Sequence, residues 1–268
     1  MGDFLTEMRQ SSQRRVDRLY TTQRQDLYAH RAATTQRVLS TPFSRGIIAE
    51  IKPTSPAEGS FQQTFSVDDA VQRALAYERG GAVALSILTE PERFHGDLDV
   101  LRAVANAVSI PVMRKDFLID PIQLNESALA GANGVLLIAR MMPFAQLETM
   151  LLRAADLNLF VLLEAFDSAD IAIINRLFPH FPNLYVGINS RDLTTLKIRK
   201  EAFAGLVNAL PNTTRLVAES GLNHPEDVAR VRELGFPLQL VGSAFMRHPD
   251  PETMVTNFHR TSLQGVGE

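Results

Sequence analysis

The sequence predicts an α/β protein, namely a (β/α)8 TIM barrel with an extra N-terminal helical segment. Eight apolar runs of strand length recur along the chain, and helical patterns lie between them. Strict alternation of strands and helices is typical of a parallel sheet covered by helices. Eight such units within about 200 residues favour closure of the sheet into a barrel.

The predicted strands are short and apolar, as expected for a sheet buried on both faces. They cover residues 46–52, 82–90, 110–117, 134–140, 159–166, 184–190, 215–221 and 238–245. The clearest helical patterns, several of which begin at Asp, Ser or Pro and end at Gly, cover residues 66–80, 97–108, 121–131, 143–157 and 224–235. An open doubly wound sheet is the alternative, but no G-x-G-x-x-G motif follows the first strand.

The chain has 268 residues, 45% of them hydrophobic, which suffices for one large core. We expect a single domain over residues 1–268, with a barrel core at 45–250. Residues 1–44 are predicted to form one or two helices of an N-terminal extension over part of the barrel. We interpret the basic residues of this extension as the solvated face of a helix: Arg14, Arg15, Arg18, Arg24, Arg31 and Arg37.

Composition excludes several classes of function. The sequence has no Cys, which rules out disulfides, thiolate nucleophiles and cysteine zinc sites. The net charge of -3 gives no electrostatic case for nucleic acid. Because we find neither a signal-peptide pattern nor an apolar run that could span a bilayer, we expect a cytoplasmic protein without a membrane partner.

Polar residues stand at the carboxyl ends of five predicted strands. Residues two apart in a strand face the same side, so Glu50 and Lys52 point together, above Ile48. The same counting pairs Met113 with Lys115, Leu162 with Glu164, Gly187 with Asn189, and Val217 with Glu219. Barrel enzymes build their active sites at this end of the strands. Burying three carboxylates and two ammonium groups is costly, which favours a catalytic site over a set of structural ion pairs.

Glycines in the last two loops indicate a phosphate site. Gly221 is the last residue of the seventh predicted run, and the Gly242-Ser243 pair lies near the end of the eighth. Such residues leave backbone N–H groups uncovered near helix starts, which is how barrels commonly bind a phosphate dianion. We therefore expect a phosphorylated small-molecule substrate.

Metal and hydrolase sites are not expected. The six His residues are dispersed, and none pairs with a carboxylate at ligand spacing on one predicted helix. Ser220 has no His near it in a nucleophile arrangement, which argues against a hydrolytic triad.

Eight segments in combination resemble the indole-3-glycerol phosphate synthase family. From about residue 45 to 250, in the family's order, they read AEIKPTSP, LSILTEPERFHGDLDVL, PVMRKDFLIDPIQL, GVLLIAR, LLEAF, GINSRDL, AESGL and LVGSAFMR. The combined pattern is highly specific, whereas any single fragment is weak.

This resemblance implies a carbon-carbon lyase, a decarboxylase of tryptophan biosynthesis that needs no cofactor. The implied substrate, 1-(2-carboxyphenylamino)-1-deoxyribulose 5-phosphate, is cyclised with loss of carbon dioxide and water. Closing the ring needs a general acid at the ribulose carbonyl, because attack by the aryl carbon builds negative charge on that oxygen. Lys115, in the RKDF motif, matches the family's lysine for this role.

The resemblance also implies roles for the other residues. Glu164 matches the carboxylate that acts as base. Lys52 is expected to pair with negative groups of the substrate, and Glu50 is expected to orient Lys52 and tune its pKa. Which lysine acts as acid in the dehydration stays open. Asn189 and Glu219 are expected in the catalytic group, where they position the ribulose hydroxyls and the acid. The remaining positions expected at the substrate are Ser55, Arg191, Ser220, Gly221, Gly242 and Ser243, with Phe94 and Leu137 as apolar walls for the anthranilate ring.

Two alternative functions stay open. The neighbouring barrel enzyme phosphoribosylanthranilate isomerase would demand a Cys base near the first strand, and the sequence has no Cys. A catalytically idle paralogue would bind a phosphorylated metabolite or a partner enzyme, but the presence of Lys115, Glu164 and Glu50 argues against it. The resemblance also leaves room for association with other tryptophan-pathway enzymes.

Overall fold

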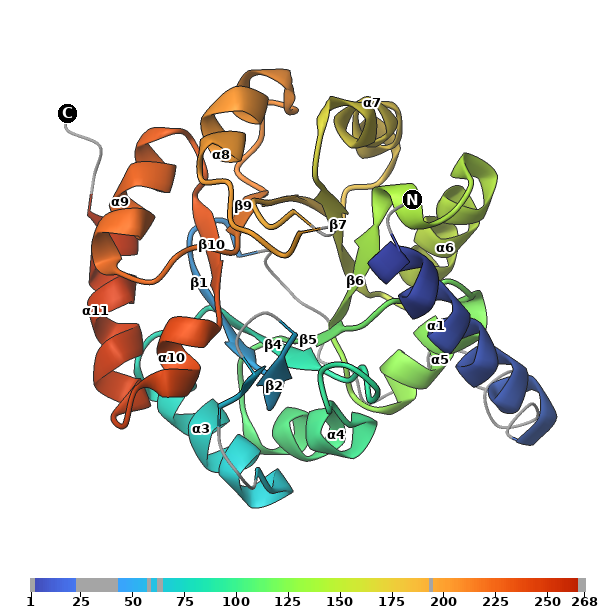
Figure 1. Ribbon diagram of the computed structural model, residues 1–268, viewed down its shortest axis with the longest axis horizontal. Helices are drawn as coiled ribbons and strands as arrows, with labels where there is room; N and C mark the ends of the chain where they lie inside the picture. Colours follow the sequence, from blue (N-terminus) through green and yellow to red (C-terminus); the bar gives the residue numbers. More distant parts are fainter. Residues whose placement is uncertain (1–2, 23–42, 57–58, 62–64, 193–194, 265–268) are drawn as a thin grey trace.

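The computed structural model describes residues 3–22, 43–56, 59–61, 65–192 and 195–264, and its strands form a closed parallel barrel (Figure 1). The strand order is β1-β10-β9-β8-β7-β6-β5-β4, and β1 pairs with both β10 and β4. The strands are β1 (Gly46–Ile51), β4 (Ala84–Leu88), β5 (Val112–Lys115), β6 (Gly134–Ile138), β7 (Phe160–Ala165), β8 (Leu184–Asn189), β9 (Leu216–Glu219) and β10 (Leu238–Val241). Each lies within a predicted run, so the (β/α)8 barrel is confirmed and the open sheet is wrong.

Helices surround the strands as a ring, in which α11 contacts both α9 and α3 (Figure 1). The helices of this ring are α3 (Val67–Arg79), α4 (Leu98–Ala107), α5 (Pro121–Leu129), α6 (Phe144–Asp156), α7 (Ser168–Leu177), α8 (Glu201–Leu206), α9 (Pro225–Glu233), α10 (Ser243–Arg247) and α11 (Pro251–Leu263). Short 3-10 turns occupy Ala139–Met141, Phe178–His180 and Val207–Ala209, and a small hairpin pairs β2 (Thr54–Ser55) with β3 (Gly59–Ser60). Among the described helices, none combines the length and the apolar character that a membrane crossing requires.

The helix starts follow the signals in the sequence. At α3, the Ser66 side chain accepts a hydrogen bond from the N–H of Asp69, whose carboxylate accepts one from the N–H of Ser66. At α5, Asp120 caps the first turn and Pro121 occupies its first position. These caps satisfy N–H groups that have no partner inside a helix.

The core lies on both faces of the barrel wall. Every residue of β1, β7 and β8 is buried. Side chains that point outward pack against the helices, and those that point inward fill the barrel, so both kinds are mostly Val, Ile and Leu. Among the buried polar residues of the strands, Glu50, Glu164, Asn189 and Glu219 lie at or near the carboxyl ends of their strands.

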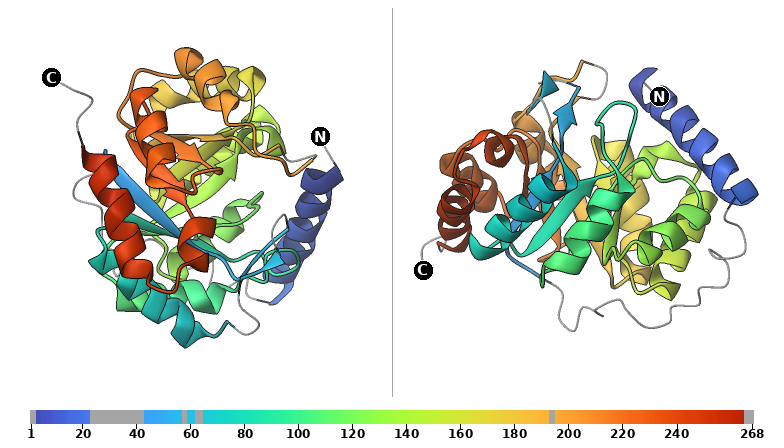
Figure 2. Two further views of the ribbon diagram at one scale, coloured as in Figure 1. Left: turned by 60° about the vertical axis from the view of Figure 1, so that its left-hand side comes forward. Right: turned by 90° about the horizontal axis from the view of Figure 1, so that it is seen from below.

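The N-terminal helix α1 (Asp3–Thr22) lies on the outside of the barrel next to α5 (Figure 2). It buries Leu5, Met8 and Val16. The interpretation of its arginines as solvated is wrong for Arg15, which forms a buried ion pair. The rest of the proposed extension, with Arg24, Arg31 and Arg37, lies outside the described residues, and the division into domains stays a prediction.

Candidate active site

A pocket opens at the carboxyl ends of the barrel strands. Five strands direct polar side chains into it: Glu50 from β1, Lys115 from β5, Glu164 from β7, Asn189 from β8 and Glu219 from β9. The loops add the other expected residues, which are Lys52, Ser55, Phe94, Arg191, Ser220, Gly221, Gly242 and Ser243. The structure therefore brings together every predicted site residue except Leu137.

Two lysines approach one buried carboxylate. Lys52 Nζ lies 2.9 Å from Glu50 Oε1, and Lys115 Nζ lies 3.8 Å from Glu50 Oε2. Burial favours the protonated form of Glu50, but Lys52 and Lys115 outweigh it and hold the pKa of Glu50 below its ordinary value. Burial lowers the pKa of Lys115, and the carboxylates of Glu50, Glu164 and Glu219 more than compensate, so this pKa is raised. Lys115 therefore carries its proton at neutral pH.

Glu164 has one hydrogen-bonded oxygen and one free oxygen. Asn189 Nδ2 donates to Glu164 Oε1 at 2.6 Å, whereas Oε2 is buried and receives no hydrogen bond from the described residues. Burial raises the pKa of Glu164, and the nearby Lys115 charge and the Asn189 hydrogen bond oppose the shift without cancelling it. A carboxylate with a raised pKa and a free oxygen can accept a proton from a ligand.

Glu219 is the least solvated carboxyl group of the cluster. Both of its side-chain oxygens are buried without a hydrogen-bond donor among the described residues. Burial, and then the negative charge of Glu164, raise the pKa of Glu219 well above its usual range. Glu219 is therefore the carboxyl group of this cluster that holds a proton most readily.

Two glycines leave space for these carboxylates. A Cβ atom at Gly187 would overlap Glu219 Oε1. A Cβ atom at Gly242 would overlap Glu50 Oε1 and lie 3.1 Å from Lys52 Nζ. Gly242, the residue before α10, thus brings the expected phosphate loop against the Glu50–Lys52 pair.

The loop after β9 contains two residues in the left-handed region. Ser220 has a φ of 69° and Gly221 a φ of 72°. A Cβ atom at Gly221 would lie 2.6 Å from Ile198 Cγ2, so the backbone there passes close to the loop that follows β8. In that loop, the Arg191 guanidinium donates to the carbonyl of Leu196 at 2.9 Å.

The apolar wall of the pocket differs from the expected one. Leu136 and Ile138 of β6 line the pocket, and Leu137 does not. Ile138 is the register partner of Glu164, which points inward, so the residue before Ile138 points toward the helices. Placing Leu137 in the site was wrong by one residue in strand parity.

Two aromatic residues that the sequence reasoning missed also line the pocket. Phe117 and Phe4 join Phe94 there, and the ring centroid of Phe117 lies 5.8 Å from that of Phe4 and 6.1 Å from that of Phe94. Phe117 stands two residues after Lys115. Residues two apart in an extended chain face the same side, so this spacing could have predicted Phe117 in the pocket. Phe4 comes from α1, and the sequence gives no local sign of its contact with Phe117.

Comparison with known proteins identifies the family of this chain. Residues 5–258 match the family model described as indole-3-glycerol phosphate synthase. The proteins of that name from Methanopyrus kandleri and Geobacillus kaustophilus are 41% and 40% identical to this chain. The matches cover 78% of this chain in both cases, and 80% and 79% of the two relatives.

Solved structures show the same fold at low identity. The 3-hexulose-6-phosphate synthase of Salmonella typhimurium matches with a TM-score of 0.64 and 13% identity, over 81% of this chain and 98% of that chain. The orotidine 5'-phosphate decarboxylase of Pyrococcus horikoshii matches with a TM-score of 0.59 and 12% identity, over the same shares. These two likenesses concern the barrel alone. The family model and the curated relatives show more, and the chain belongs to the indole-3-glycerol phosphate synthase family.

Proposed function

We propose that this barrel cyclises 1-(2-carboxyphenylamino)-1-deoxyribulose 5-phosphate to indole-3-glycerol phosphate, with release of carbon dioxide and water. The observation that carries the proposal is the placement of the Lys115 ammonium among three buried carboxyl groups, those of Glu50, Glu164 and Glu219. The reaction needs both a proton donor and a proton acceptor in one pocket, and this cluster supplies the two.

Lys115 serves as the general acid of ring closure. The aryl carbon that carries the carboxylate bonds to the ribulose carbonyl carbon, and the carbonyl oxygen takes the electron pair and receives a proton from Lys115. The raised pKa of Lys115, to which Glu50, Glu164 and Glu219 contribute against burial, supports its starting in the protonated form. Carbon dioxide then leaves, and the electron pair of the broken bond restores the aromatic ring.

Glu164 serves as the base of the dehydration. It removes a proton from the carbon next to nitrogen in the new five-membered ring, and the hydroxyl group leaves as water after protonation. Burial raises the pKa of Glu164, which makes it a stronger base than an exposed carboxylate. Lys52 and Lys115 are the two candidate donors to the departing hydroxyl, and Glu50 orients both through its two oxygens.

The remaining pocket residues orient the substrate. The phosphate is assigned to the loops after β9 and β10, with Lys52 nearby, and the anthranilate ring to the aromatic wall of Phe4, Phe94 and Phe117. The residues assigned to the phosphate, the ribulose hydroxyls and the acid groups are Gly221, Gly242, Ser243, Asn189, Glu219, Ser55, Arg191 and Ser220.

A cytoplasmic location and association with other enzymes of the tryptophan pathway belong to the same proposal. The absence of Cys is compatible with a reducing compartment. The family membership supports a role among the enzymes that supply the substrate and use the product.

The direct test is to incubate the purified protein with the carboxyphenylamino substrate and to follow the fluorescence of indole-3-glycerol phosphate. The chain has no Trp, so new indole emission can come only from the product. We expect turnover without an added cofactor. Binding of the substrate without any turnover would instead favour the catalytically idle paralogue.

A further inference from the structure

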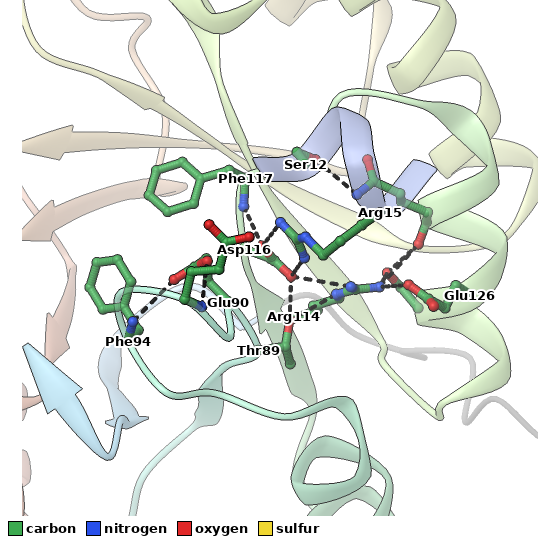
Figure 3. Close-up of polar contacts among 12 residues, drawn as sticks. Ser12, Arg15, Thr89, Glu90, Phe94, Arg114, Asp116, Phe117 and Glu126 are labelled. Carbon is green, nitrogen blue, oxygen red and sulfur yellow. Dashed lines mark hydrogen bonds and ion pairs between the residues drawn. The ribbon is translucent and has the colours of Figure 1, made fainter. Parts of the chain in front are cut away.

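A buried ion pair joins α1 to the residue that follows Lys115 (Figure 3). Arg15 Nη1 donates to Asp116 Oδ2 at 2.7 Å, and Nη2 donates to Oδ1 at 2.9 Å. The Asp116 side chain has 0% exposed surface and that of Arg15 has 12%. A bidentate contact of this kind fixes the orientation of both partners as well as their distance.

Asp116 is the centre of a larger network in Figure 3. Its carboxylate also accepts hydrogen bonds from Thr89 Oγ1 at 2.7 Å, from Arg114 Nη2 at 3.1 Å and from the backbone N–H of Phe117 at 2.7 Å. Burial would raise the pKa of Asp116, but Arg15 and Arg114 outweigh it and hold the pKa far below its ordinary value. The ion pair therefore stays charged throughout the pH range in which most enzymes work.

The same network determines where the aromatic wall of the pocket lies. Asp116 fixes the backbone of Phe117, and Arg15 fixes α1, which carries Phe4. The rings of Phe4 and Phe117 then meet edge to face. Phe94 is fixed separately, because the buried carboxylate of Glu90 accepts its backbone N–H at 3.1 Å.

We propose that Arg15 is a positioning residue for recognition of the substrate's aromatic ring, because its ion pair with Asp116 holds Phe4 and Phe117 together as one wall. This inference rests on the proposed function, which places that ring against the wall. Lys115, the last residue of β5, directs its ammonium toward Glu50 in the pocket, whereas the carboxylate of the next residue, Asp116, binds Arg15 of α1. Loss of the ion pair should therefore lower the affinity for ligands that carry the ring, and leave unchanged the affinity for ligands that bind through phosphate alone.

α1 also offers a matched control. Arg14, next to Arg15, donates to Glu92 at 2.9 Å, but 55% of the Arg14 side chain and 43% of the Glu92 side chain are exposed. Exposed pairs of this kind contribute little to stability. Arg14→Met thus removes one arginine of α1 and one ion pair, and leaves the Asp116 network intact.

The test measures binding of two ligands, indole-3-glycerol phosphate and its ring-free counterpart glycerol 3-phosphate, to four proteins by titration calorimetry. The proteins are the wild type, Arg15→Met, Arg15→Lys and Arg14→Met. In Arg15→Met we expect Kd for indole-3-glycerol phosphate to rise about 2- to 10-fold, the range of one aromatic contact, with no change for glycerol 3-phosphate. Arg15→Lys should give an intermediate loss, because one ammonium cannot form the two-pronged contact. Arg14→Met should bind both ligands like the wild type.

Each other outcome has a definite meaning. A wild type that neither turns over the substrate nor binds either ligand would overturn the proposed function together with this inference. If the wild type binds both ligands, and Arg15→Met raises the Kd of neither ligand or raises both equally, the inference alone is overturned. Thermal unfolding of each variant is measured first. If Arg15→Met does not fold, Arg15→Lys carries the comparison, and failure of both to fold would assign the ion pair to folding and overturn the inference.

Discussion

Asn189 Nδ2 lies 2.6 Å from Glu164 Oε1 and donates a hydrogen bond to it inside the barrel mouth. Asn189 is the last residue of β8, and Glu164 lies near the end of the neighbouring strand β7. Burial raises the pKa of Glu164, and this hydrogen bond, like the charge of Lys115, works in the opposite direction. Asn189 therefore limits how far burial raises the pKa of the proposed base.

Replacing Asn189 with Ala should move the acid limb of the pH profile of kcat/KM to higher pH. The hydrogen bond stabilises the charged form of Glu164, so its loss raises the pKa of Glu164, and more alkaline solution is needed to deprotonate the base. Turnover measured across pH checks this. Asn175→Ala, which removes an exposed amide bonded to the carbonyl of Ala209, is the control and should keep the limb in place. A limb that stays in place or moves to lower pH in Asn189→Ala would contradict the assignment of Glu164.

Glu164→Gln should lower kcat far more than it changes KM. The amide keeps the shape of the side chain but cannot take a proton, and general base catalysis typically contributes about 10²–10⁴-fold. Steady-state kinetics on the variant measure both constants. Glu226→Gln, an exposed change in the first turn of α9, should leave both unchanged. Near-normal kcat in Glu164→Gln would move the base role to another carboxylate, with Glu50 the next candidate.

Gly242→Ala should reduce kcat by about 10²-fold, the cost that a misplacement of about 1 Å can have for a catalytic group. The added Cβ would overlap Glu50 Oε1, and Glu50 can move only by disturbing its contacts with Lys52 and Lys115. Gly205→Ala is the matched control, because a Cβ there has no atom within 4 Å. Normal turnover in Gly242→Ala would show that the position of Glu50 does not matter for the reaction.

Glu219→Gln should raise the free energy of unfolding relative to the wild type, by an amount that grows as pH rises, and should lower activity. The folded-state pKa of Glu219 lies above its unfolded value of about 4.3, because burial and the charge of Glu164 raise it. Above about pH 4 the unfolded chain therefore gives up this proton more readily than the folded protein, and stability falls with rising pH. The neutral amide removes that penalty.

Urea unfolding of the wild type and Glu219→Gln, measured from pH 4 upward, should give a difference near zero at the acid end. The difference should grow in favour of the variant as pH rises toward the folded-state pKa of Glu219. A constant difference, or one that shrinks with rising pH, would contradict the burial of a protonated Glu219.

The fold, and the strand-end residues of the candidate site, were predictable because both depend on local sequence. An apolar run in the sequence predicts each strand. The alternation of side chains along a strand then places Lys115 and Glu164 on the inner face. Parity fails only when the register is counted from the wrong residue, as at Leu137, because all residues of β6 are equally apolar and buried. Nothing in that run distinguishes the inner face from the outer one.

The contribution of α1 could not be predicted, because it depends on contacts between distant parts of the chain. Arg15 looks like the other arginines of the extension, and only the fold brings it to Asp116, 101 positions later in the sequence. Phe4 likewise gains its place in the pocket from the packing of α1 against the barrel. An amphipathic pattern predicts that a helix packs, but not which strand end it reaches.

The role of Lys115 is the central claim, and Lys115→Met tests it most directly, with turnover and the thermal midpoint measured on the same sample. Glu50 keeps Lys52 at 2.9 Å, so the change leaves this carboxylate paired and should alter the midpoint little. Lys200→Met, which breaks the ion pair with Asp227 outside the pocket lining, controls for the loss of a paired lysine. The account predicts a folded Lys115→Met protein whose kcat is lower by at least about 10²–10⁴-fold. Near-normal turnover in a markedly destabilised Lys115→Met protein would contradict it, because the lysine would then serve the structure and not the reaction.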